Sequence, residues 1–256
     1  MKRILLATTC LALSSATAMA ADMTMPMATK ASPYAVPAFS WTGFYIGAQV
    51  GGGTLGDLQS NSEGSAPRTG GKGAIAGGQL GYNYQDGNWV FGIEGEGYWS
   101  GIKDSQTSNF VNSTTGAPTG TFNTTLENRY DFTIAGRVGL AFDRTLVFAK
   151  GGWAWGNYRL SDNSTDLIAG SSFRDLGSAT LDGALFGVGL EHALARNWTV
   201  KFEYDYIAYG SKTLTSTGCS TTGGVTSCGF DGGFPVSSTK QVFKFGANYL
   251  FDFGGR

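Results

Sequence analysis

The sequence has little of what a metal protein, a soluble enzyme or a helical membrane protein uses. It contains one histidine, three cysteines and six prolines, and only 14% of its residues are charged. After the first twenty residues, no stretch approaches the roughly 20 apolar residues of a membrane-spanning helix. The formal net charge is −1, which does not indicate nucleic acid as a partner. With so few thiols and imidazoles, we expect neither a metal site nor a cofactor.

The first twenty residues have the order of an export signal. A basic start precedes an apolar stretch over 4–13 and the small residues of 18–20, so we expect a signal peptide that is cleaved after position 20. Residues 21–40 are rich in Met and Pro without a period and predict a flexible periplasmic segment. Cys219 and Cys228 remain in the mature chain, and export predicts that they form a disulfide closing a short loop.

From position 41 onward, apolar and polar residues alternate with a period of two, which is typical of β-strands. Eight alternating stretches are expected, at 41–52, 73–85, 89–100, 127–142, 145–158, 183–194, 198–210 and 239–253. Tight gaps at 85–88, 143–144 and 195–197 alternate with long Ser-, Thr-, Gly- and Asn-rich gaps at 53–72, 101–126, 159–182 and 211–238. Bacterial outer-membrane barrels have short periplasmic turns and longer extracellular loops. The sequence therefore predicts an all-β fold, an eight-stranded antiparallel up-and-down transmembrane β-barrel over 41–256, in the outer membrane of a Gram-negative bacterium.

The two faces of these strands differ in chemistry. One parity carries large apolar residues, and we expect it to face lipid with an aromatic girdle of Trp41, Tyr82, Tyr84, Trp89, Trp99, Tyr130, Trp153, Trp155, Trp198, Tyr204, Tyr206 and Tyr249. The other parity would line the lumen with a charge network of Glu94, Glu96, Arg129, Asp131, Arg137, Lys150, Glu191, Lys201, Glu203, Asp205 and Lys244. A soluble lipocalin-like barrel, the structural alternative, would place its charges outside.

The predicted lumen favours a closed tube. An eight-stranded barrel is only just wide enough for its own side chains. The six acids and five bases of the network nearly balance, and we expect them to pair because isolated buried charges are costly. The alternative is a small porin, with a narrow pore that conducts ions or small solutes.

Three motifs carry a family resemblance. The opening Trp41-Thr-Gly-Phe-Tyr-Ile-Gly47, the strand Trp198-Thr-Val-Lys-Phe-Glu-Tyr-Asp-Tyr206 and the closing Val242-Phe-Lys-Phe-Gly-Ala-Asn-Tyr249 resemble the alphaproteobacterial 25- and 31-kilodalton outer-membrane proteins, relatives of opacity-type, porin-like small barrels. The resemblance implies an abundant surface barrel without catalytic residues, linked to envelope integrity, host interaction and, in some members, haemin binding. As partners we expect outer-membrane lipid and lipopolysaccharide, and the barrel assembly machinery, which reads a terminal aromatic residue, here Phe251 or Phe253.

The residues give haemin binding and catalysis little support. Haem ligation generally needs an exposed His, Tyr, Met or Cys, and the single His192 is expected near the periplasmic interface. A lipid-modifying enzyme would need a general base at the outer rim, so we predict that the protein is not an enzyme. We predict a structural surface barrel that contributes to envelope integrity and surface interaction. A small porin and a haemin- or host-receptor-binding protein are the alternatives.

Overall fold

The computed structural model describes residues 39–56, 59–60 and 70–251. The predicted signal peptide, almost all of the 21–40 segment and Phe253 lie outside the described residues. The strands are β1 (Gly43–Leu55), β2 (Gln59–Ser60), β3 (Lys72–Asp86), β4 (Trp89–Ser100), β5 (Lys103–Val111), β6 (Pro118–Phe142), β7 (Thr145–Asp166), β8 (Ser171–Ala193), β9 (Trp198–Thr222) and β10 (Val225–Leu250). The described part of the chain contains no helix that is long and apolar enough to cross a membrane.

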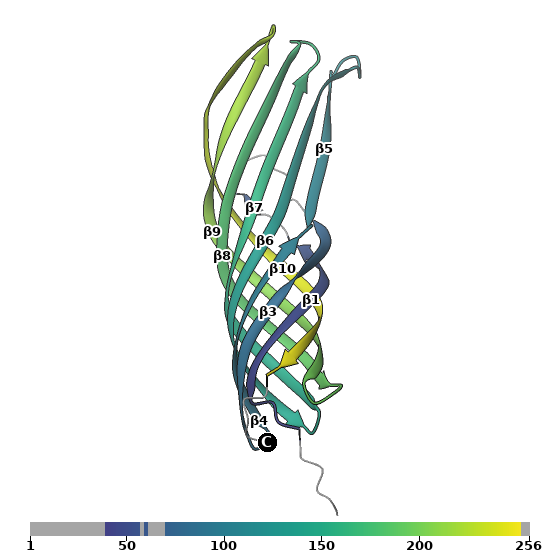
Figure 1. The fold of residues 1–256 in the computed structure, drawn as a ribbon. Coiled ribbons are helices and arrows are strands. Elements are labelled where there is room, and N and C mark those ends of the chain that lie inside the picture. Colours follow the sequence, from purple (N-terminus) through teal and green to yellow (C-terminus); the bar gives the residue numbers. More distant parts are fainter. Residues whose placement is uncertain (1–38, 57–58, 61–69, 252–256) are drawn as a thin grey trace, which may run out of the picture. The chain divides into compact units, whose positions relative to one another are not determined.

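Eight of these strands form a closed antiparallel ring (Figure 1). The order is β1-β10-β9-β8-β7-β6-β4-β3, and pairing of β1 with β3 closes the circle. Closure removes the unpaired edges that an open sheet would expose to hydrocarbon. The predicted all-β, eight-stranded barrel is therefore confirmed. Two further strands lie outside the ring: β5 pairs mainly with β6, and β2 pairs with β10.

The tight connections lie where the sequence predicts them. Residues 87–88 join β3 to β4, residues 143–144 join β6 to β7, and residues 194–197 join β8 to β9. Gly87 adopts a φ of 58° and Asp143 a φ of 53°, in the left-handed region that glycine adopts freely and that Asp tolerates better than most residues.

The long connections differ from the expectation of loops. Residues 101–126, 159–182 and 211–238 mostly form β-structure, because β5–β6, β7–β8 and β9–β10 continue as long hairpins beyond the ring (Figure 1). Their Ser and Thr alternate along extended backbone, and the ladder pairs backbone groups that a loop would leave to water. Most of the first long connection lies outside the described residues.

The hairpin tips are closed by local hydrogen bonds. Asn112 Oδ1 accepts from the backbone N–H of Thr114 at 2.9 Å and of Thr115 at 3.0 Å. Asp166 Oδ1 accepts from the N–H of Ile168 and Ala169 in the same way, at 2.8 and 3.0 Å. Asn and Asp side chains favour such turns, which explains why the strands reverse at these points.

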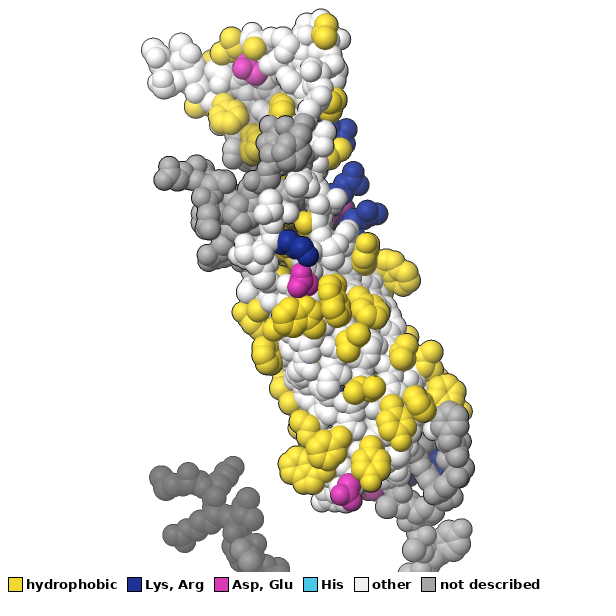
Figure 2. Space-filling model, turned by 90° about the vertical axis from the view of Figure 1, so that its left-hand side faces the viewer, with side chains coloured by type: hydrophobic (Ala, Val, Ile, Leu, Met, Phe, Trp, Pro, Cys, Tyr) yellow, Lys and Arg dark blue, Asp and Glu magenta, His cyan; other side chains and the backbone are white. Residues whose placement is uncertain are grey.

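The outward face of the ring is apolar. Figure 2 shows a belt of hydrophobic side chains on the lower part of this face. The rings are strongly exposed, as for Trp99 at 75% and Phe186 at 62%, an arrangement that suits contact with lipid rather than water. Of the residues predicted for the girdle, Tyr82 and Tyr204 are half-buried and the rest are exposed, except Trp41.

Trp41 is a correction to that prediction, because its side chain is 0% exposed. It has the parity of the buried Tyr45 rather than that of the exposed Phe44 and Ile46, so the alternation itself places it on the inner side. Its backbone N–H donates to Gln85 Oε1 at 2.8 Å, and the ring packs with Val90, Leu146 and other apolar residues inside the barrel.

Candidate functional site: a charged lumen

The inward parity of the ring gathers buried ionic groups. Eleven charged side chains, each 4% exposed or less, occupy the lumen: Glu94, Glu96, Asp131, Arg137, Lys150, Glu191, Lys201, Glu203, Asp205, Lys240 and Lys244. They come from β4, β6, β7, β8, β9 and β10. The period of two in each strand places them on one side, and glycines between them leave room for the long side chains.

Two lysines, Lys150 and Lys201, form the centre of this lumen network. Lys150 Nζ lies 3.2 Å from Glu94, 3.0 Å from Glu96 and 2.7 Å from Glu203. Lys201 contacts the same three carboxylates at 3.1, 3.4 and 3.0 Å. These carboxylates lie within 4.8 Å of one another, a spacing that would suit a cation. The ammonium groups supply the positive charge at that point.

Lys244 extends the centre along the lumen. Its Nζ lies 2.6 Å from Glu96, 2.5 Å from Glu203 and 2.6 Å from Asp205. It also lies 5.9 Å from the centre of the Tyr98 ring, within the range of a cation–π contact. Each acid is thus shared between several cations, so the loss of one cation would affect several carboxylates.

Ion pairs continue on both sides of the centre. Toward the tight turns, Arg137 pairs with Glu191 at 2.7 Å and with Glu94 at 3.4 Å. Glu191 also accepts from Thr199 at 2.5 Å and from Asn248 at 2.8 Å.

Toward the hairpins, Lys240 pairs with Asp131 at 2.6 Å. Asp131 accepts from the Tyr209 hydroxyl, also at 2.6 Å. At Glu191 and Asp131, neutral donors therefore add to the contacts that the cations make.

Two clusters of buried apolar side chains adjoin the network, one toward the hairpins and one toward the tight turns. The hairpin-side plug consists of Leu55, Ile75, Tyr98, Ile102, Leu126, Ala135, Ala154, Tyr158, Leu160, Leu181, Leu185, Ile207, Tyr209 and Val242. The turn-side plug consists of Trp41, Val90, Ala141, Leu146, Phe148 and Ala193. All of these side chains are 5% exposed or less. The lumen therefore holds an ionic centre with a cluster of buried apolar side chains toward each end.

Comparison with known proteins agrees with this architecture. Residues 8–251 match the profile of the family described as "Outer membrane protein beta-barrel domain". The chain belongs to this family. The 31 kDa outer-membrane immunogenic protein of Brucella melitensis is 34% identical over 230 residues, covering 84% of this chain and 90% of the relative. The 22 kDa outer membrane protein of Rhizobium leguminosarum is 34% identical, covering 69% of this chain and 68% of the relative.

A solved structure shares the fold of this barrel family. The outer membrane protease OmpT of Escherichia coli superposes with a TM-score of 0.50 at 9% identity, covering 84% of this chain and 98% of that protein. Such low identity shows the fold alone. The relatives confirm both the resemblance to the small alphaproteobacterial outer-membrane proteins and the location in the outer membrane of a Gram-negative bacterium.

Two basic residues of the barrel differ from the predicted network. Arg129 is exposed, because a β-bulge between Asn128 and Tyr130 shifts the register of β6 against β7. The bulge turns Arg129 and Tyr130 to the same outer side, so the parity prediction for Arg129 is wrong. Lys240 takes its place in the network. It has the same parity as Lys244, a signal that the sequence offered and that our prediction did not use.

The predicted disulfide is present. Cys219 and Cys228 are bonded and lie directly opposite each other on β9 and β10, with their Cα atoms 4.1 Å apart. They join the two strands of a hairpin rather than a loop. The bond lies beyond the ring, near the tip at residues 223–224, where both glycines have positive φ.

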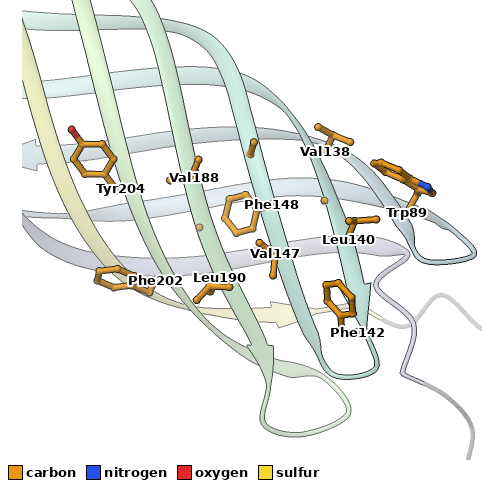
Figure 3. A pocket seen from close by; sticks show the side chains of 13 residues that line it. Trp89, Val138, Leu140, Phe142, Val147, Phe148, Val188, Leu190, Phe202 and Tyr204 are labelled. Atoms are coloured by element: carbon orange, nitrogen blue, oxygen red, sulfur yellow. The ribbon is translucent and has the colours of Figure 1, made fainter.

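The outer wall also has an apolar hollow of about 700 Å³ (Figure 3). Its walls include Trp89, Leu140, Val147, Leu190 and Phe202, and its floor includes glycines. The side chains in Figure 3 come from neighbouring strands of the lipid-facing wall. A hollow on that wall would be filled by hydrocarbon chains of the bilayer.

Proposed function

We propose that this protein is a structural barrel of the outer membrane with a closed lumen, which contributes to envelope integrity and presents β-hairpins at the cell surface. One observation carries the proposal: the ionic network lies between two apolar plugs in the same lumen. A polar core alone would leave room for a water-filled path. Apolar layers above and below it remove that path, because an ion crossing them would lose its hydration without gaining a partner.

The small-porin alternative has less support. Conducting barrels keep a water-filled polar channel, whereas here the ammonium groups of Lys150, Lys201 and Lys244 bridge carboxylates from opposite strands. An ion could pass only after several of these pairs had separated. Breaking one buried pair is strongly unfavourable, so we expect no steady conductance.

Haemin binding by axial ligation also has little support. The hairpin stretches 103–126, 159–182 and 211–238 contain no His, Tyr or Met, and the two cysteines there are bonded to each other. The imidazole of His192 lies at the tight-turn end of β8 and shares a hydrogen bond of 3.0 Å with Thr145. The surface role that we propose for the hairpins therefore rests on their shape and polarity, not on a haem ligand.

Catalysis is not part of the proposal. Each carboxylate of the lumen network has a cationic partner and is buried, so none is available as an accessible general acid or base. OmpT is named as a protease. At 9% identity, nothing of its activity carries over to this chain.

Planar-bilayer recording of the refolded protein tests the closed lumen. Folded protein is first verified by its faster mobility on unboiled gels, and its insertion into liposomes is verified by flotation. We expect no stable current steps and no swelling of the loaded liposomes in isosmotic sugar. Steps of uniform size from verified, inserted protein would contradict the proposal and favour the porin.

A further inference from the structure

Basic side chains form a row on the outer face, beyond the lipid-facing belt. Lys72 is the cross-strand partner of Lys103, Lys103 of Glu127, and Glu127 of Arg159, so these four residues lie side by side on β3, β5, β6 and β7. All four are exposed or half-buried. The bulge that removes Arg129 from the lumen adds it to this surface, two residues from Glu127. We call Lys72, Lys103, Arg129 and Arg159 the basic row.

The basic row carries excess positive charge. Its four cations share one carboxylate, and Glu127 pairs with Lys103 at 2.7 Å. Within the described residues, Lys72, Arg129 and Arg159 form no ion pair. By contrast, the neighbouring Lys212 is paired with Asp182 at 3.0 Å. The row therefore leaves several cationic donors unengaged at one place.

The excess is local to the basic row, because elsewhere beyond the ring the exposed Arg174 and Lys212 are accompanied by Asp104, Asp162, Asp166 and Asp182, which are exposed or half-buried. At the tight-turn end, the exposed Arg144 and Arg196 are matched in number by the exposed Asp86 and Asp143. A general surplus of surface charge would not produce this difference, since the whole chain has a formal net charge of −1.

The basic row lies just beyond the part of the barrel wall that faces the bilayer. Lys103 lies four residues beyond Trp99, and Arg159 lies four residues beyond Trp155, on strands that rise about 3.3 Å per residue. The cations are thus about 13 Å along the strand from rings of the kind that mark a membrane interface. Figure 2 shows dark blue basic side chains directly above the belt of hydrophobic ones.

A hollow adjoins the row on its β3 side. It has a volume of about 330 Å³ and is lined by Lys72, Thr54, Phe243 and the glycines of β1 and β3. The hydroxyl-bearing Thr54 and Ser178 continue the row on either side, as partners of Lys72 and Arg159. The surface therefore combines cations, hydroxyls and a small recess.

We propose that the basic row binds the phosphate groups of lipopolysaccharide, the phosphorylated glycolipid of the outer leaflet, while its acyl chains lie on the aromatic belt below. Guanidinium groups bind phosphate through paired, charge-assisted hydrogen bonds. A soluble polyanion would bind the cations but not the aromatic belt. A zwitterionic lipid would contact the belt but has no excess negative charge for four cations to bind. This inference goes beyond the closed lumen and does not depend on it.

Titration of the folded protein in a zwitterionic detergent with diphosphoryl lipid A tests the proposal. The double variant Arg129→Gln/Arg159→Gln should bind this probe about tenfold more weakly than the wild type, because two charge-assisted contacts are lost. The matched control Arg144→Gln/Arg196→Gln removes two exposed arginines at the other end and should bind as the wild type does. Gel mobility of unboiled samples verifies that both variants fold.

Further probes separate the possible sources of phosphate. We expect dephosphorylated lipid A to bind about tenfold more weakly than the diphosphoryl form and to be insensitive to the Arg129 and Arg159 substitutions. Inorganic phosphate and a heparin fragment should bind far more weakly than lipid A. Equal binding by the two double variants would overturn the proposal. So would heparin or inorganic phosphate binding as tightly as lipid A, since the belt would then contribute nothing.

Discussion

Lys244 shows how single residues hold the lumen together. Its ammonium lies within 2.6 Å of Glu96, Glu203 and Asp205. Replacement by Met keeps most of the volume but leaves these carboxylates without one shared cation. We expect Lys244→Met to lower the free energy of unfolding by roughly 3–5 kcal/mol, the usual effect of breaking a buried ion pair. The midpoint of urea unfolding in detergent, followed by tryptophan fluorescence, measures the change.

The control for that variant is the same substitution at an exposed pair. Lys212 pairs with Asp182 at 3.0 Å on the outer surface, where water screens the attraction. Lys212→Met should therefore leave the unfolding midpoint almost unchanged. If the two variants shifted the midpoint equally, the lumen network would not be a source of stability.

At the scale of single residues, prediction from the sequence failed at the β-bulge in β6. The parity rule placed Glu94, Lys150 and Glu203 correctly inside, because each lies in an uninterrupted ladder. It failed for Arg129, because the β-bulge adds one residue to β6 and the strict alternation of inward and outward side chains is broken at that point. Nothing local in Asn128-Arg129-Tyr130 marks the bulge, which arises from the register of β6 against β7.

At the scale of elements, the disulfide joins two strands that are already paired. Cys219 and Cys228 are direct partners in the β9–β10 ladder, beyond the ring. We expect the double variant Cys219→Ser/Cys228→Ser to lower the free energy of local opening of this hairpin tip by about 2–3 kcal/mol, the stabilisation estimated for a disulfide that closes a loop of about ten residues. Amide hydrogen exchange should accelerate near residues 219–228, while the unfolding midpoint of the barrel stays unchanged.

The β5–β6 hairpin serves as the internal control for that experiment. It has no cysteines and is separated from the β9–β10 hairpin by β7 and β8, so exchange at its tip should be the same in the wild type and in the double variant. A lower barrel midpoint in the double variant would show that the hairpin and the ring unfold as one unit. That result would contradict the local role that we assign to the bond.

Element-scale prediction identified the ring but missed the hairpins. Composition rich in Ser, Thr, Gly and Asn indicated loops at 159–182 and 211–238, whereas these stretches pair with each other across β8 and β9. Such pairing joins residues that are far apart in the sequence, and local composition does not reveal it. The hairpin-side plug was missed for the same reason, because Leu126, Leu160 and Leu181 lay in or at the edges of the expected loops.

At the scale of the whole molecule, the asymmetry of the connections predicts one orientation. Outer-membrane barrels keep short turns in the periplasm and long segments outside. The basic row lies toward the hairpin end, so in the predicted orientation it would face the leaflet that carries lipopolysaccharide. The orientation predicted from the connections and the position of the basic row are therefore consistent with each other, although they are inferred from different residues.

Cysteine labelling on intact cells tests this orientation. In the Cys219→Ser/Cys228→Ser background, Ala169→Cys places a thiol at the exposed tip of the β7–β8 hairpin, and Asn88→Cys places one in an exposed tight turn. A membrane-impermeant maleimide should label the first variant on intact cells and the second only after the outer membrane is permeabilised. Labelling of Asn88→Cys but not of Ala169→Cys on intact cells would mean that the barrel is inverted. The basic row would then face the periplasmic leaflet, and its assignment to lipopolysaccharide would fail with it.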